Sequence, residues 1–405
     1  MTVRYASLFS QLLDHFPRSE FAHLVAKHKA EQAAKGFESW VQFVAMLFCH
    51  LAHAESLREI CNGMACCLGK LAHLGIHKDK MPNKSTLSYA NRHRPAALFE
   101  DLFWTVLDRM RKSGGLGTRK KKFRFKNKLL SLDTTIISLC LSLFPWASFR
   151  RQKGGVKVHV LLDHDDYMPR WILVGNAREH DSLGARLLTP VAGSIIAFDR
   201  AYNDYDLFAK WTDQGVYFVT RMKSNADYDV VEERPVSGGG KILSDEVIRL
   251  ASAKAHKACP HVLRRVVVWD DANAREIVLL TNHLAFAAST IASIYKDRWE
   301  IEIFFKALKQ NLKIRTFVGT NENALLTQIW TALIALLLLR WLHHLSHASW
   351  SFSNLACMAR LSLFTYRDLR DWIKAPFGQP TGPAPPPIGV QLELPLPGFG
   401  QPART

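Results

Sequence analysis

The sequence predicts an α/β protein in which a small all-α region comes first and a β-rich insertion interrupts the main sheet. Apolar residues recur at helical spacing between positions 37 and 51, which indicates helices early in the chain. Residues 156–162, reading VKVHVLL, alternate like a strand, and residues 129–132 and 170–174 read as its partners in an antiparallel meander. After further short strand-like runs, residues 322–346 are again helical and very apolar.

We expect four regions along the 405 residues. Residues 1–118 form an N-terminal helical region, and residues 119–345 form the main α/β domain with its β-rich insertion at about residues 215–285. Residues 346–374 form a C-terminal helical region. Residues 375–405 carry most of the prolines, which predicts an extended and weakly ordered tail.

The charge balance limits the classes of partner. Lys and Arg number 53 against 36 for Asp and Glu, which gives a formal net charge of +17. An excess of this size points to a polyanion, most often nucleic acid. The seven cysteines are odd in number and scattered, which argues against a disulfide framework. The apolar run at residues 332–339 is too short to span a bilayer, so we expect a soluble cytoplasmic protein with no membrane partner.

Residues 295–309, reading YKDRWEIEIFFKALK, place their polar side chains as if for one face of a single helix. At 100° per residue, Tyr295, Arg298, Glu302 and Lys309 fall within an arc of about 60°, and Lys306 lies about 20° beyond its edge. A carboxylate flanked by a phenol, a guanidinium and ammonium groups can hold a metal beside a phosphate. An exposed charged face next to a buried apolar stripe explains the same spacing equally well.

Two further carboxylates follow apolar strands. Asp133 is expected at the end of the strand at residues 129–132, and Asp199 follows the strand at residues 194–198. Together with Glu302 they could hold two divalent metals about 4 Å apart, an arrangement that clamps the oxygens of a phosphodiester. Mg²⁺ prefers oxygen ligands, so we expect two Mg²⁺ ions, with Mn²⁺ able to substitute. Each aspartate could instead be a turn or cap residue.

Three motifs resemble bacterial insertion-sequence transposases: LLSLDTT around Asp133, IIAFDRAY around Asp199, and Tyr295-x2-Arg298-x3-Glu302-x6-Lys309. They are similar to the insertion-sequence-four family of the DDE, or retroviral-integrase-like, superfamily. The resemblance covers about residues 125–345. It implies an RNase H-like core with a mixed five-stranded sheet, in which the three carboxylates are the catalytic metal ligands.

The resemblance also implies contacts to DNA. Tyr295 and Arg298 would hold a phosphate near the transposon end, Lys309 would hold another part of the backbone, and Arg221, in FVTRMKSN, would join the phosphate clamp. In relatives that cut through a DNA hairpin, a flipped base stacks on tryptophan. Trp299 is one candidate for that role. Trp269 is a weaker one, since a packed strand aromatic explains it at least as well.

Basic residues outside the motifs predict further DNA contacts. Seven cations lie between Arg119 and Lys128, and we expect Lys120, Lys121 and Lys122 to contact phosphates, although a solvated linker is the alternative. Lys306 on the charged helical face would add to them. Arg92 belongs to a short helix with basic flanks, a pattern that suits a DNA-contacting helix and an ordinary surface helix equally.

The expected function is cut-and-paste DNA transposition. By the resemblance, the protein would bind the terminal inverted repeats of its own element through the N-terminal region. It would cut there by two-metal hydrolysis and join the 3′-OH ends to target DNA as a homodimer. Two alternatives remain: a catalytically silent or domesticated DNA-binding repressor, and an RNase H-like nuclease without strand transfer. Binding alone needs no metal triad, so the three intact carboxylates speak against the repressor.

Overall fold

The computed structural model describes most of the chain, and the structural statements below concern these residues: 6–32, 34, 36–67, 71–114, 116, 122–139, 144, 146, 148–150, 153–176, 181–236, 240–311, 317–346, 350–375 and 377. Lys120 and Lys121 lie outside them, as does nearly all of the expected proline-rich tail.

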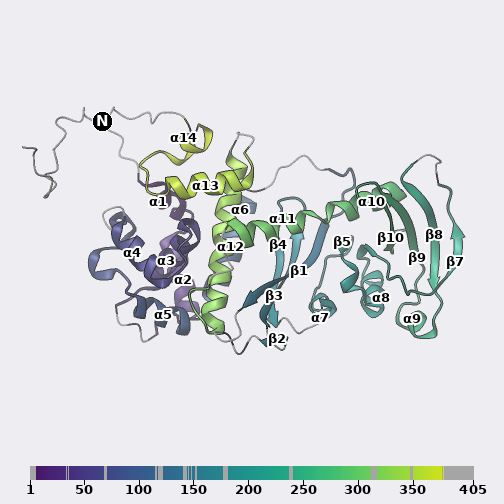
Figure 1. Cartoon of the computed structure of the whole chain (residues 1–405), viewed down its shortest axis with the longest axis horizontal. Helices are drawn as coiled ribbons and strands as arrows, with labels where there is room; N and C mark the ends of the chain where they lie inside the picture. Colours follow the sequence, from purple (N-terminus) through teal and green to yellow (C-terminus); the bar gives the residue numbers. More distant parts are fainter. Residues whose placement is uncertain are drawn as a thin grey trace, which may run out of the picture.

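A helical body occupies one end of the molecule, and the sheet extends away from it (Figure 1). Its helices come from both ends of the chain: α1 Leu8–Leu13, α2 Arg18–Lys27, α3 Ser39–Ala52, α4 Leu57–Cys66, α5 Lys84–His93, α6 Ala97–Lys112, α12 Glu322–Leu345, α13 Phe352–Ser362 and α14 Leu369–Lys374, with short 3₁₀ turns at η2 Ala72–Leu74 and η3 Lys78–Lys80. The expected N-terminal helices are therefore present, and α12 packs among them.

Helix α12 packs against α3, α5 and α6. By length and composition α12 could cross a membrane, but 83% of its most apolar window is buried inside the protein. A helix that is apolar on nearly every side must be covered on nearly every side, and here other helices cover it. The sequence assigns residues 322–345 to the α/β domain. That boundary stays a prediction, although these packing partners belong to the N-terminal region.

The sheet is mixed and contains ten strands. They are β1 Leu129–Leu139, β2 Ser148–Arg150, β3 Lys153–Asp163, β4 Pro169–Asn176, β5 Ile195–Phe198, β6 Tyr217–Arg221, β7 Tyr228–Glu233, β8 Ile242–Leu250, β9 Leu263–Asp270 and β10 Arg275–Thr281. Between and after them lie α7 Asp181–Arg186, η5 Arg200–Tyr202, α8 Tyr205–Asp213, α9 Ala253–Ala258, α10 Ala288–Asp297, α11 Glu300–Lys306 and a π-helix, η6, at Ala307–Asn311.

The strand order is β2-β3-β1-β5-β6-β10-β9-β8-β7, with β4 also paired to β3. Strands β1, β3 and β4 form the expected antiparallel meander. Strand β5 pairs in parallel with both β1 and β6, so the path β4-β3-β1-β5-β6 has five strands of mixed direction. The expected insertion does not form a separate sheet, because β10 pairs with β6 and extends the same one. The strand at β6, which the sequence places inside the insertion, lies in the parallel part.

Two expectations about local structure are wrong. Asp133 is not at the end of a strand, since β1 continues through Leu139 by pairing with β3. Residues 295–309 are not one helix, because α10 ends at Asp297 and α11 begins at Glu300. Both errors concern where an element ends, which is the feature that sequence patterns predict least well.

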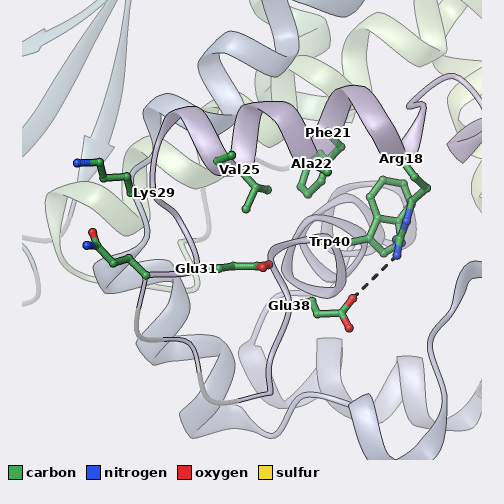
Figure 2. Close-up of a pocket in the computed structure, with 10 residues that line it drawn as sticks. Arg18, Phe21, Ala22, Val25, Lys29, Glu31, Glu38 and Trp40 are labelled. Carbon is green, nitrogen blue, oxygen red and sulfur yellow. Dashed lines mark ion pairs between the residues drawn. The ribbon is translucent and has the colours of Figure 1, made fainter.

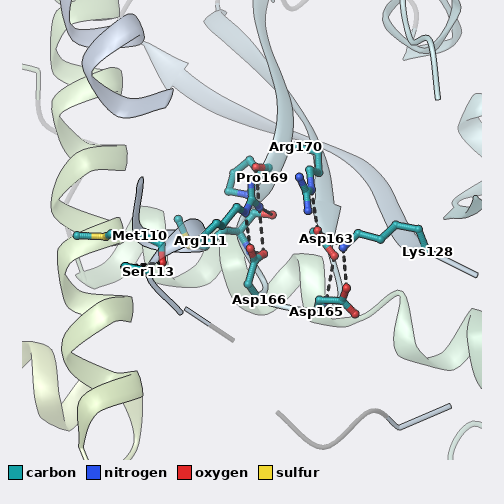
Figure 3. Close-up of polar contacts among 10 residues, drawn as sticks. Met110, Arg111, Ser113, Lys128, Asp163, Asp165, Asp166, Pro169 and Arg170 are labelled. Atoms are coloured by element: carbon teal, nitrogen blue, oxygen red, sulfur yellow. Dashed lines mark hydrogen bonds and ion pairs between the residues drawn. The ribbon is translucent and has the colours of Figure 1, made fainter. Parts of the chain in front are cut away.

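A polar clamp joins the helical body to the sheet at the turn between β3 and β4 (Figure 3). Arg111, in the last turn of α6, donates from Nε and Nη2 to the two carboxylate oxygens of Asp166, the latter at 3.1 Å. Its Nη2 also donates to the carbonyl of Pro169 at 3.2 Å. In the same turn, Asp163 accepts from Lys128 at 2.8 Å and from Arg170 at 2.7 Å. The turn is therefore fixed both to the sheet and to α6.

The clamp predicts that two adjacent cations, Arg111 and Lys112, contribute differently to the free energy of unfolding. Arg111→Met would leave the Asp166 carboxylate, whose side chain is only 6% exposed, without its cation. We expect a loss of about 2–3 kcal/mol in the free energy of unfolding, below the value for a fully buried pair because the amide of Met168 still donates to Asp166. Urea denaturation measures this loss.

The control is Lys112→Met, whose partner Asp108 is exposed, as is Lys112 itself. Exposed pairs contribute little, so we expect a change within about 0.5 kcal/mol. Equal losses in the two variants would show that the Arg111–Asp166 clamp contributes nothing special to stability.

Candidate active site

The sheet places two aspartates side by side. Leu132 of β1 pairs with Phe198, the last residue of β5, and the next residue along the chain in each case is a carboxylate, Asp133 and Asp199. The two strands are parallel, so both carboxylates lie at the same level of the sheet. Helix α11 packs against β1 and carries Glu302. The three carboxylates expected from the sequence thus come from neighbouring elements.

Backbone hydrogen bonds orient the two aspartates. Asp133 Oδ1 accepts from the amide of Thr134 at 2.8 Å. Asp199 Oδ1 accepts from the amide of Arg200 at 2.5 Å, where it caps the 3₁₀ turn η5. In each case one carboxylate oxygen is committed to the backbone, and the second oxygen of Asp133 is paired with Arg298.

Arg298 lies between two of the carboxylates. Its Nη1 is 3.2 Å from Asp133 Oδ2, and its Nη2 is 3.5 Å from Glu302 Oε1. The residue is buried, and within the described part of the chain its Nε has no hydrogen-bond partner. The guanidinium therefore holds the positive charge that balances this group of acids.

The pKa values reflect this crowding. Burial raises the pKa of Asp133 to about 6, and the carboxylates of Glu302 and Asp199 add to the rise, whereas the Thr134 amide and Arg298 oppose it. Burial alone would lower the pKa of Arg298, but the negative groups around it raise that pKa overall. Arg298 therefore offsets only part of the combined effect of burial and neighbouring carboxylates on Asp133.

Although α10 and α11 are separate helices, the turn between them keeps Tyr295, Arg298 and Glu302 close to one another. The amides of Arg298 and Trp299 bond three residues back, to Tyr295 and Lys296, both at 3.3 Å. Such bonds tighten the turn and change the direction of the helix without proline or glycine. The Arg298 guanidinium carbon still lies 5.5 Å from the centre of the Tyr295 ring.

The other expected DNA-contacting residues occupy different places. Arg221 ends β6 and is close enough to Tyr295 to lower its pKa, against a larger rise from burial. Trp299 and Lys306 are exposed beside the carboxylates on the α10–α11 segment, and Lys309 lies on the π-helix. Trp269 is exposed near the end of β9, and Arg92 is exposed on α5 of the helical body.

Lys122, expected on a phosphate, forms an ion pair with Asp297 at the end of α10. That acid was not among the residues expected at the site. A second group that sequence reasoning missed surrounds Thr134, whose hydroxyl contacts Tyr202 and lies 2.8 Å from His159 Nδ1. Tyr202 stands in IIAFDRAY next to Asp199, so the motif contained the signal, but its partner on β1 is distant in sequence.

Two hollows differ in charge. One of about 380 Å³ beside Asp199 is lined by Arg200, Lys223 and three small or polar residues, with no acid among them. The other, of about 390 Å³, lies between α2 and α3, where the guanidinium of Arg18 stacks 4.2 Å from the Trp40 ring (Figure 2). Two glutamates, Glu31 and Glu38, line it as well. Only the first hollow suits an anion.

Metal binding needs one rearrangement. In the described part of the chain, no three His, Cys, Asp or Glu side chains are gathered as a ready ligand set. The guanidinium of Arg298 stands between Asp133 and Glu302 and supplies the positive charge there. Carboxylate oxygens are the type of donor that Mg²⁺ prefers, so Asp133, Asp199 and Glu302 are the residues here that could hold it.

Two family models match the chain. Residues 4–77 match a domain of unknown function (DUF4372), and residues 124–338, more than half of the chain, match the Transposase DDE domain. The second match includes all three carboxylates and Arg298.

Curated relatives agree with this match. A putative transposase of Sinorhizobium fredii is 32% identical over 292 residues, covering 71% of this chain and 79% of the relative. A probable transposase for insertion sequence element IS5377 of Geobacillus stearothermophilus is 30% identical, covering 64% of this chain and 67% of the relative. Among solved structures, the piggyBac transposase synaptic complex with hairpin DNA aligns at a TM-score of 0.42 and 13% identity, covering 92% of this chain and 81% of that one. On the family model and these relatives, the chain belongs to the bacterial DDE transposases.

Proposed function

We propose that this transposase cuts its own element at the terminal inverted repeats and joins the resulting 3′-OH ends to target DNA. The observation that carries the proposal is the convergence of Asp133, Asp199 and Glu302 around Arg298. Carboxylates brought together at this cost in charge repulsion are typical of a site that binds divalent cations. The strand order β4-β3-β1-β5-β6 supports an RNase H-like core for the same chemistry.

Asp133, Asp199 and Glu302 would hold two Mg²⁺ ions, with Mn²⁺ able to substitute. Bound there, the metals would stabilise the negative charge on the attacking and leaving oxygens of the phosphodiester. Arg298 would leave Asp133 and bind the DNA phosphate, for which a guanidinium has the right two-pronged geometry. Tyr295 lies against Arg298 and would donate its hydroxyl to the same phosphate.

Other DNA contacts follow from exposure and charge. Arg221 and the basic hollow beside Asp199 would receive neighbouring phosphates, with Lys306 and Lys309 further along the backbone. Exposed Trp299 adjoins Arg298 and is better placed than Trp269 to stack on a flipped base. Two protomers would act together on paired ends, as in the expected homodimer.

Helix α5 would recognise the element ends. Its exposed residues form two adjacent stripes: Lys84, Ser88 and Arg92, and Ser85, Tyr89 and His93. The helix contains no acid, and the Tyr89 and His93 rings stack 4.0 Å apart on its surface. A cationic helix face with hydroxyl and aromatic groups suits DNA. Because α12 packs on α5, end binding is best tested on the full chain.

Glu302→Gln tests the proposed triad. It keeps the shape of the side chain but removes its charge, so single-turnover cleavage of an end-containing duplex should fall on the order of 10³-fold. Binding of the same duplex, measured by anisotropy, should stay within about threefold.

The control is Glu300→Gln. Glu300 lies two residues before Glu302 on the same helix, and none of the described hydrogen bonds joins it to Arg298. It should cleave at the parent rate. Comparable cleavage by Glu302→Gln and the parent would remove Glu302 from the triad, and cleavage without joined products would favour the simple nuclease.

Asp133→Asn tests the charge crowding. The pKa of Asp133, about 6, lies above its ordinary 3.8, so the ionised carboxylate destabilises the metal-free fold above pH 6 and this cost disappears as the pH falls toward 4. Two pKa units correspond to about 3 kcal/mol at most, and partial exposure (20%) reduces this. We expect the variant to be about 1–2 kcal/mol more stable at pH 8 without metal and no more stable at pH 4.

Thermal melts with chelator or Mg²⁺ measure this. Mg²⁺ should raise the parent melting temperature at pH 8, and the rise should be much smaller in Asp133→Asn. A variant that is less stable than the parent at pH 8 would show that Asp133 is compensated by Arg298 rather than crowded.

A further inference from the structure

A buried chain of hydrogen bonds joins β1 to the junction of α10 and α11. Ser131 Oγ lies 2.7 Å from His164 Nε2, and His164 Nδ1 lies 2.8 Å from Asp297 Oδ2. The other oxygen of Asp297 pairs with the ammonium of Lys122. Ser131 is fully buried, and the side chains of His164 and Asp297 are 6% and 5% exposed.

The order of serine, histidine and aspartate is that of hydrolytic triads, but this serine is no nucleophile. Ser131 lies inside the sheet, where β3 and β5 pair with it on both sides, opposite Leu162 and Ala197. A buried strand residue cannot reach a substrate. The chain of bonds therefore fastens elements together rather than performing chemistry.

This chain runs beside the Arg298 contacts. Ser131 and Asp133 are two residues apart on β1 and so face the same side of the sheet. Asp297 and Arg298 are consecutive at the end of α10. Two links thus connect the same strand to the same junction: Ser131–His164–Asp297, and Asp133–Arg298–Glu302.

The two links differ in whether the proposed reaction requires them to open. Under the proposed function, Asp133 must take a metal and Arg298 must take a phosphate, so their contact at 3.2 Å has to open. The His164 link contains no group that the reaction uses. Its histidine sits in the turn that Arg111 and Arg170 hold through Asp166 and Asp163 (Figure 3), so the anchor itself is fixed.

We propose that His164 is a positioning residue for catalysis: through Asp297 it holds the α10–α11 junction on β1 while Arg298 turns from Asp133 to the DNA phosphate. The proposal rests on the proposed function of the carboxylate site. Without His164, the junction would lose its link through Asp297 at the same step in which the Asp133–Arg298 contact opens. Arg298 and Glu302 would then be misplaced, and displacements of about 1 Å can cost 10²-fold in rate.

The test is single-turnover cleavage of an end-containing duplex at saturating DNA and Mg²⁺, at a temperature where circular dichroism shows every variant folded. His164→Ala should cleave about 10–100-fold more slowly, with the half-saturating DNA concentration within twofold of the parent. His164→Asn keeps a donor near the position of Nδ1, so it should recover most of the rate. If packing alone mattered, Asn would recover only a small part of the rate, because its carboxamide fills only part of the imidazole volume.

The matched control is Arg170→Met, which removes one of the two cations on Asp163, leaves Lys128 and Arg111 to hold the same turn, and does not reach Asp297. It should cleave within twofold of the parent. If His164→Ala does not fold, Ser131→Ala removes one bond of the same link and should slow cleavage by several-fold.

The outcomes separate the two proposals. No cleavage by the parent overturns the proposed function. Cleavage by the parent with an equal rate in folded His164→Ala, or in Ser131→Ala where that variant replaces it, overturns the positioning role alone. Equal losses in His164→Ala and His164→Asn overturn it as well, since the bond to Asp297 would then be irrelevant.

Discussion

The guanidinium of Arg298 is the group on which the carboxylate site depends. Three acids on two strands and a helix would repel one another in a partly buried place, and Arg298 offsets two of them at 3.2 and 3.5 Å. The parallel register of β1 and β5 sets the aspartates, and the tight turn after α10 sets Arg298 and Glu302. The pKa of Asp133 stays raised, chiefly because the carboxyl is buried and also because Glu302 and Asp199 lie near it. Arg298 therefore offsets only part of the cost of gathering these acids.

Local pattern predicted much of this arrangement. The alternation around VKVHVLL and short loops gave the meander, and the four-residue step from Arg298 to Glu302 gave their contact, since such pairs meet on any helix. Element ends were harder. Strand β1 continues past Asp133 because Thr134 to Leu139 pair with β3, and α10 breaks where hydrogen bonds tighten at Arg298 without a proline or glycine to mark it. The first depends on partners far away in sequence, and the second on a local turn that no residue type marks.

Composition predicted that α12 is a helix but not what covers it. An all-apolar helix needs partners on every side, and the sequence does not name them. In the structure α12 lies against α3, α5 and α6, and Asn323 at its start donates to the last carbonyls of α5, including that of Arg94 at 2.7 Å. The segment that follows the carboxylate helix therefore supports the helix proposed to read DNA. Together with the Arg111–Asp166 clamp, this gives two physical connections between end recognition and cleavage.

The turn between β3 and β4 explains how the ion pairs of the carboxylate site can change while the surrounding backbone stays in place. Four consecutive residues, Asp163 to Asp166, each bind neighbouring side chains: Asp163 binds Lys128 and Arg170, His164 binds Ser131 and Asp297, Asp165 binds Lys128, and Asp166 binds Arg111. Bonds sealed from water do not exchange readily, whereas the Arg298 pairs, whose carboxylate partners Asp133 and Glu302 are 20% and 36% exposed, can exchange one anion for another. A durable link next to an exchangeable one allows Arg298 to change partners while its backbone stays in place. The Ser131–His164–Asp297 chain thus supports the carboxylate site and is not a separate functional site.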